Sequence, residues 1–184
     1  EDWWDFSSKS CGKPVDRVEI RIDSDDPMKK VGEIQARGNS IMSGYFKNEE
    51  ATAAAFTADG WMRTGDLGVV DAAGNIFIKG RSKNMILSAN GQNIYPEEIE
   101  AVINNQDYVI ESVVVDRGAS LVALVYVDGD KLTADGLNLD EQMNLMRTAV
   151  NAEMPAYSKI TKVEVMDQPF EKTPKMSIKR FMYK

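Results

Sequence analysis

The sequence has 184 residues, 43% hydrophobic and 28% charged, a composition typical of a folded protein with one medium or two small domains. Its 22 basic and 29 acidic residues give a net charge of −7, and this excess of acidic groups argues against a nucleic-acid-binding protein. The absence of histidine excludes histidine-based triads and histidine metal ligands, and the single Cys11 excludes a disulfide framework and suits a reducing cytosol.

The first residues indicate a piece of a longer polypeptide. The chain begins with Glu1 rather than methionine, and Trp3, Trp4 and Phe6 stand among polar residues without a clear period. No signal peptide is visible, and no apolar run approaches the roughly 20 residues that cross a bilayer. We therefore expect a fragment of a cytoplasmic protein without a transmembrane segment.

Residues 14–80 carry the alternation and the turn signals of a β-rich region. An acidic run at residues 23–27 is interpreted as a solvated turn rather than a cation site. Asn48 is placed to cap a short helix that ends near Phe56, and further turns are expected at residues 59–60 and 73–75. The candidate strands of this region are residues 15–22, 31–37, 41–46, 67–70 and 76–79.

After Gly80 the pattern changes to α+β. Pro96 is well placed as the first residue of a helix, and Asn138, followed three residues later by Glu141, is typical of the start of a second helix. Residues 167–184 look irregular and basic. The change at Arg81–Lys83 predicts a boundary between two closely coupled lobes. The strands expected in the second lobe are residues 85–87, 109–115, 121–127 and 160–165.

Four motifs occur in a fixed order. Residues 44–48 read Gly-Tyr-Phe-Lys-Asn, residues 60–68 Gly-Trp-Met-Arg-Thr-Gly-Asp-Leu-Gly, residues 79–83 Lys-Gly-Arg-Ser-Lys, and residues 91–100 Gly-Gln-Asn-Ile-Tyr-Pro-Glu-Glu-Ile-Glu. This series resembles the adenylate-forming superfamily, which includes acyl-CoA synthetases, firefly luciferase and the adenylation domains of peptide synthetases.

The resemblance implies a particular domain organisation. Residues 1–80 would be the β-rich subdomain, a distorted barrel, that ends the family's large adenylation domain, here truncated on its N-terminal side. Residues 81–184 would be the small α+β lid domain, with a short sheet flanked by helices. The family's phosphate loop and its Tyr-Gly-x-Thr-Glu element are not found in the sequence. Both are expected in a missing N-terminal large domain, so this fragment alone should be inactive.

The resemblance also implies a two-step reaction. A carboxylic acid reacts with ATP, with Mg²⁺ present, to give an acyl-adenylate and pyrophosphate, and the thiol of CoA then displaces AMP. The lid rotates between the two steps. General similarity of the lid and tail favours an AMP-forming fatty-acid–CoA ligase that acts on long-chain acids.

Four residues match functional positions of this family. Asp66 would accept hydrogen bonds from the ribose hydroxyls, and Arg81 would approach the same sugar with its planar fork. Lys83 occupies the pivot about which the lid turns, and Gly91 lies in the loop that faces the pantetheine tunnel of CoA. The ordinary alternatives are a turn aspartate, a surface salt bridge, a surface lysine and a turn glycine.

The tail departs from the family pattern. Family members carry a catalytic lysine in a sequence like Pro-Arg-Thr-Pro-Thr-Gly-Lys-Ile. An ungapped alignment places Met176 on the glycine and Ser177 on the lysine. A serine cannot supply the positive charge that polarises the carboxylate and the α-phosphate. Lys175 is therefore the candidate catalytic residue, unless adenylation by this protein is slow or has been lost. The ordinary alternative for this basic tail is a solvated chain end.

Two further functions remain open. The chain could belong to an adenylation domain or an aryl-acid ligase of secondary metabolism. It could also be a nonenzymatic, nucleotide-responsive lid module, which the serine at position 177 favours.

Overall fold

The chain forms two compact units, residues 1–84 and 85–184. The structure is a computed structural model that describes residues 7–88, 90–118 and 120–183. Trp3, Trp4 and Phe6 lie outside the described residues. The expected β-rich part followed by an α+β part is confirmed, and each unit has its own sheet.

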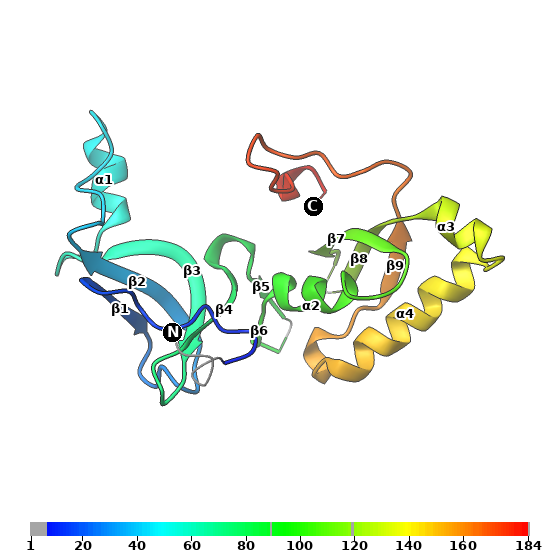
Figure 1. Cartoon of the computed structure of the whole chain (residues 1–184), viewed down its shortest axis with the longest axis horizontal. Helices are drawn as coiled ribbons and strands as arrows, with labels where there is room; N and C mark the ends of the chain where they lie inside the picture. Colours follow the sequence, from blue (N-terminus) through cyan, green and yellow to red (C-terminus); the bar gives the residue numbers. More distant parts are fainter. Residues whose placement is uncertain (1–6, 89, 119, 184) are drawn as a thin grey trace. The chain divides into compact units, whose positions relative to one another are not determined.

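The first unit is built on an antiparallel sheet in the order β1-β2-β3-β4 (Figure 1). Because successive side chains of a strand point to opposite faces, alternate apolar residues such as Ile22, Ile34 and Ala36 are buried on one side. The helix α1 interrupts the connection from β2 to β3, and Asn48 caps it as expected by accepting a hydrogen bond from the Ala51 amide. The bounds are β1 Val18–Asp23, β2 Gly32–Gly38, α1 Glu49–Ala55, β3 Met62–Val70 and β4 Ile76–Arg81.

The strand expected at residues 41–46 is wrong. This segment is irregular, with Tyr45 in an isolated bridge to Asn48 and Phe46 88% exposed. The Tyr45 amide donates to Thr52 Oγ1 at 2.9 Å, so its hydrogen-bonding capacity serves the start of α1 rather than a sheet. Apolar residues alone do not make a strand where the backbone has no neighbouring strand to pair with.

The second unit contains a mixed sheet in the order β7-β8-β9, preceded by the two-stranded pair β5-β6. Strand β7 is antiparallel to β8, and β9 is parallel to β8, so the chain crosses over through α3 and α4. Pro96 is the first residue of α2, as expected, and Asn138 caps α4 by accepting from the Glu141 amide. The bounds are β5 Ile86–Leu87, β6 Asn93–Ile94, α2 Pro96–Ile103, β7 Val109–Asp116, β8 Leu121–Val127, α3 Gly129–Ala134, α4 Leu139–Glu153 and β9 Lys162–Val165.

The sheet of the second unit is buried on both faces. One face packs against α2 and α4, which contribute apolar residues such as Ile99, Ile103 and Val150 to this core. The other face, with Val113 and Leu124, packs against Phe170 at the start of the C-terminal segment. Strand β8 is therefore apolar along its whole length, and β7 is apolar from Val113 to Val115, as expected for strands covered on both sides.

Candidate functional site

Asp66 and Arg81, the two predicted nucleotide contacts, face each other on neighbouring strands. They are cross-strand partners of β3 and β4, and Arg81 Nε lies 2.9 Å from Asp66 Oδ1. The Asp66 side chain keeps 29% of its surface exposed and that of Arg81 52%. The pair therefore combines a fixed relative geometry with access from solvent, which suits a group that donates hydrogen bonds to one carboxylate.

The backbone before Asp66 is shaped by local side chains. Gly65 has a φ of +73°, a conformation that favours glycine, and its amide donates to Glu33 Oε1 at 3.3 Å. Thr64 Oγ1 donates to the Ile34 carbonyl at 2.6 Å and accepts from the Asp66 amide at 3.1 Å. These bonds hold the turn of the Thr-Gly-Asp motif and so determine where the carboxylate points.

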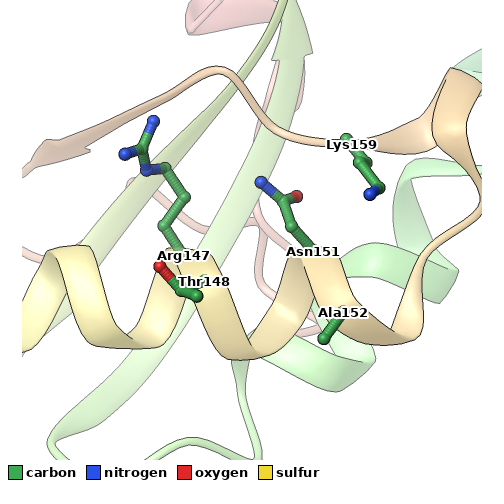
Figure 2. Close-up of a pocket in the computed structure, with 5 residues that line it drawn as sticks. All are labelled: Arg147, Thr148, Asn151, Ala152 and Lys159. Carbon is green, nitrogen blue, oxygen red and sulfur yellow. The ribbon is translucent and has the colours of Figure 1, made fainter.

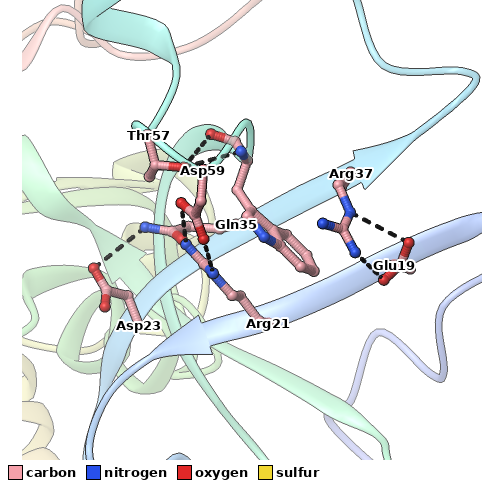
Figure 3. Close-up of polar contacts among 8 residues, drawn as sticks. Glu19, Arg21, Asp23, Gln35, Arg37, Thr57 and Asp59 are labelled. Carbon is pink, nitrogen blue, oxygen red and sulfur yellow. Dashed lines mark hydrogen bonds and ion pairs between the residues drawn. The ribbon is translucent and has the colours of Figure 1, made fainter.

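Trp61, the second residue of the motif at residues 60–68, lies between two arginines. The guanidinium carbons of Arg21 and Arg37 are each 4.5 Å from a ring centroid of Trp61. Asp59 binds Arg21 through both carboxylate oxygens, and Glu19 does the same for Arg37 (Figure 3). This network fixes the start of β3, and its cations are already paired with carboxylates of the same unit.

Lys83, the predicted pivot, lies in the 3₁₀ turn η2 (Ser82–Asn84). Its side chain is exposed, and the first compact unit ends one residue later at Asn84. This place in the chain is compatible with a pivot.

Gly91, the predicted CoA-loop residue, lies in the turn between β5 and β6. It has a φ of +79°, and its amide donates to the Ser88 carbonyl at 2.9 Å. Beyond its chain neighbours, no atom of the described residues lies within 4 Å of the position that a Cβ would take. The turn conformation alone favours a glycine here.

Lys175 lies at the exposed tip of a small hairpin in the C-terminal segment. The Met176 amide donates to the Thr173 carbonyl, and the Thr173 amide donates to the Ser177 carbonyl, both at 2.8 Å. Met176 has a φ of +60°, the left-handed conformation that glycine adopts without strain. A methionine thus occupies the conformation expected at the family's glycine position, which supports the alignment that puts Ser177 at the position of the lysine.

Sequence reasoning missed three charged residues of the second unit. Glu100 is only 7% exposed because it lies on the inner face of α2 beside Ile99 and Ile103. Its carboxylate binds Arg180 of the tail. Burial raises the pKa of the Glu100 carboxyl above its ordinary value, while the Arg180 guanidinium acts in the opposite direction. Glu111 of β7 binds the tail as well. The sequence signal for the contact between Glu100 and Arg180 was a glutamate on the apolar face of the predicted helix.

An open cavity of about 380 Å³ lies on the second unit, and none of the predicted site residues lines it (Figure 2). Arg147 and Asn151 on its wall donate to the carbonyls of Thr161 and Ile160. Its lining residues are Arg147, Thr148, Asn151, Ala152 and Lys159.

Two kinds of site are not found in the part of the chain that the structure describes. No three acidic, cysteine or histidine side chains gather there in a way that could hold a metal ion. No helix within residues 7–88, 90–118 and 120–183 is long and apolar enough to cross a membrane.

An antiparallel β unit that presents the Asp66–Arg81 pair, followed by an α+β unit with a glycine loop and a basic tail hairpin, is the arrangement expected of an adenylate-forming enzyme's C-terminal part. Residues 83–183 match the family described as AMP-binding enzyme C-terminal domain. The chain belongs to this family.

Relatives support the same family. The chain is 44% identical to the 7a-methyl-1,5-dioxo-octahydro-indenyl-propanoyl:CoA ligase of Mycobacterium tuberculosis, over 72% of this chain and 24% of that protein. It is 34% identical to a long-chain-fatty-acid–CoA ligase of the same organism, over 96% of this chain and 32% of that protein. The chain thus spans about a quarter to a third of the length of these relatives.

A solved structure agrees with the fold. The O-succinylbenzoate coenzyme A synthetase of Bacillus subtilis, in complex with AMP, superposes with a TM-score of 0.80 and 28% identity, over 96% of this chain and 35% of that one. The same synthetase has also been solved with ATP and a magnesium ion. The acids that these three relatives activate differ, while their ligase class is shared.

Proposed function

We propose that this chain is the C-terminal part of an AMP-forming acid–thiol ligase that converts a fatty acid, ATP and CoA to acyl-CoA, AMP and pyrophosphate through an acyl-adenylate. The observation that carries the proposal is the Asp66–Arg81 pair within a chain of the AMP-binding enzyme family. The match to a long-chain-fatty-acid–CoA ligase over 96% of the chain supports the choice of acid.

Asp66 and Arg81 would together hold the sugar of the nucleotide. A carboxylate can accept from two vicinal hydroxyls, and the ion pair with Arg81 Nε fixes the direction in which the Asp66 carboxylate points. The remaining guanidinium N–H groups of Arg81 would reach the ribose oxygens. The phosphates and Mg²⁺ would be held by the N-terminal large domain that we expect as partner, because the family's phosphate loop and Tyr-Gly-x-Thr-Glu element are not found in this sequence.

The second unit would act as the lid. Lys83 would absorb the backbone rotation that turns the lid between the two steps, because a single cleft must first stabilise phosphate charge and later admit a thiol. The loop of Gly91 would face the pantetheine arm of CoA during the thioester step. Lys175, the cation at the hairpin tip, would supply positive charge to the carboxylate and α-phosphate during adenylation.

The serine at position 177 favours a second candidate, a lid that responds to nucleotide without adenylating an acid. A ligase for aromatic acids or an adenylation domain of secondary metabolism is a further alternative, because relatives of the chain act on ring-bearing acids. Pyrophosphate exchange by the longer protein with fatty and aryl acids distinguishes the three. Exchange with fatty acids supports the proposal; intact nucleotide binding without exchange for any acid supports the second candidate.

The ribose role is tested by Asp66→Ala in the longer protein. Loss of the carboxylate removes charge-assisted hydrogen bonds of about 1.5–3 kcal/mol, so kcat/KM for ATP should fall by about 10- to 100-fold. Asp71→Ala, which changes a turn aspartate after the same strand, is the matched control and should leave ATP use nearly unchanged. Normal ATP kinetics for the Asp66 variant would refute the role.

A further inference from the structure

Two partly buried carboxylates hold the two sides of the tail hairpin. On the entry side, Glu111 Oε1 accepts a hydrogen bond from the Phe170 amide at 3.0 Å, and Glu111 Oε2 lies 2.6 Å from Lys172 Nζ. The Glu111 side chain is 13% exposed. The first residues of the tail are therefore fixed to β7 by one side chain.

The exit side is held by Glu100 of α2. Glu100 Oε1 accepts from the Val114 amide of β7 at 2.6 Å, and Glu100 Oε2 binds Arg180 in the turn η4 (Arg180–Met182). Arg180 Nη2 also lies 3.9 Å from Glu97, one helical turn before Glu100. Since β7 is an edge strand, Glu100 pairs an amide that would otherwise lack a strand partner and at the same time anchors the tail.

Between these anchors the tail is folded on itself. The Lys179 amide donates to the Glu171 carbonyl at 2.8 Å, and the Glu171 amide donates to the Tyr183 hydroxyl at 2.7 Å. The rings of Phe170 and Tyr183 meet edge to face with centroids 5.0 Å apart. Residues 171–179 thus form a short, doubly anchored hairpin with Lys175 at its tip.

The Glu100–Arg180 contact is more consequential than a surface ion pair. The two side chains are 9% and 20% exposed, so removal of either partner leaves the other charge poorly solvated. The contact also joins the tail to α2, the helix that follows the loop of Gly91 by four residues. The hairpin and the loop of Gly91 are therefore both connected to α2, within the second unit.

We propose that Glu100 and Arg180 are positioning residues for the adenylation step, because their ion pair holds the hairpin tip and with it Lys175 in the reactive place. This inference rests on the proposed function. A misplacement of about 1 Å costs a catalytic group about 100-fold in rate. In the proposed mechanism the tip acts during adenylation, so the thioester step should be largely independent of the pair.

The position of the tail is tested first, on the 184-residue chain, by hydrogen exchange of the Thr173 and Lys179 amides. In Arg180→Met both amides should exchange at least about tenfold faster, while amides of the buried strand β8 stay protected. Arg180→Lys should restore part of the protection. Glu100→Gln is the partner variant, and Arg147→Met, which changes an arginine outside the hairpin, is the matched control.

The catalytic consequence is tested in the longer protein by separate assays of the two half-reactions. Arg180→Met should lower pyrophosphate exchange by about 100-fold, Arg180→Lys should recover part of it, and thioester formation from supplied acyl-adenylate should stay within about threefold of wild type. Equal loss in both half-reactions, or unchanged protection of the tail amides, would overturn the inference.

The two proposals can fail separately. A wild-type longer protein that shows no pyrophosphate exchange with any acid overturns the proposed function and the catalytic part of this inference. Normal exchange in wild type, together with normal exchange in Arg180→Met, overturns the positioning role alone.

Discussion

At the scale of single residues, the contribution of Met176 to stability depends more on its backbone conformation than on its side chain. Met176 is 72% exposed and has a φ of +60°, so its side chain contributes little to a core while its backbone is strained. The conformation is retained because the hydrogen bonds around the tip of the hairpin require it. The identity of residue 176 therefore affects stability mainly through this strain.

Met176→Gly should stabilise the second unit. The substitution relieves a left-handed conformation that costs about 1–2 kcal/mol for a residue with a Cβ. Glycine has more conformational freedom in the unfolded chain, and this entropy offsets part of the gain in stability. We expect a net gain of about 0.5–1 kcal/mol in the free energy of unfolding, measured by urea denaturation. Met176→Ala keeps the strain and is the control; an equal gain for alanine would contradict this reasoning.

The buried carboxyl of Glu100 predicts a pH dependence. Burial raises its pKa above the ordinary value of 4.5, against the opposing effect of Arg180 and in the same direction as nearby Glu97. A raised folded-state pKa means that the carboxyl's contribution to stability is fully present below the unfolded-state pKa and is lost as the pH rises through the folded-state pKa.

The free energy of unfolding of wild type relative to Glu100→Gln should therefore fall as the pH is raised from about 4 to about 7. Denaturation followed by circular dichroism at several pH values measures this difference. A difference between the two proteins that does not vary over this range would show that burial does not control the titration of Glu100.

At the scale of secondary-structure elements, the close approach of β3 to its neighbours depends on a glycine of the Thr-Gly-Asp-Leu-Gly motif. A Cβ on Gly68 would lie 2.6 Å from the Phe77 carbonyl oxygen and 2.9 Å from Ile34 Cδ1. The first neighbour is backbone of β4 and cannot move without disturbing the sheet. Gly68 also borders the irregularity in the β3–β4 pairing that follows Asp66.

Gly68→Ala should lower the free energy of unfolding of the first unit by about 1–3 kcal/mol, because the added methyl group must displace the sheet. Tryptophan fluorescence during urea denaturation reports this unit through Trp61. Gly129→Ala is the control. Apart from its chain neighbours and the backbone of its own helix, no atom of the described residues lies within 4 Å of the Cβ position at Gly129. This substitution should change the free energy of unfolding by less than about 0.5 kcal/mol. A neutral Gly68 variant would mean that the sheet accommodates the methyl group.

At the scale of the whole molecule, the two compact units end and begin next to Lys83. Each unit has its own hydrophobic core, with Ile34 and Trp61 in the first and Ile99 and Val150 in the second. Two separately packed units joined without a long linker are what a lid rotation about one residue requires.

Lys83→Pro should impair the thioester step of the longer protein while adenylation is spared, because proline holds φ near about −65° and so opposes rotation at this position. Separate measurement of pyrophosphate exchange and of acyl-CoA formation from supplied acyl-adenylate tests the prediction. Lys79→Ala, four residues earlier in β4, is the control for a charge change near the junction. Equal loss in both steps would count against Lys83 as the pivot.

Local signals were sufficient to predict most elements. Asn48, Pro96 and Asn138 each mark a helix start, because caps and first-turn preferences depend on residues within one turn of each other. Strand β8 was visible from its continuous apolar run, and β7 from the apolar residues on both sides of Glu111 and Ser112. The segment 41–46 failed as a strand because a short apolar run does not reveal whether a pairing strand is available. The helix α3 was not predicted because its six residues are too few to show a helical period.

The sequence by itself determined the family, the order of the two units and the candidate residues Asp66, Arg81, Lys83, Gly91 and Lys175, because these depend on motifs that are contiguous in the chain. Only the tertiary structure decided that Asp66 pairs with Arg81 and that Glu100 holds Arg180, 80 residues further along. Pairing of distant charges depends on which strand register and which helix face the packing of the core selects, and no local pattern encodes that choice.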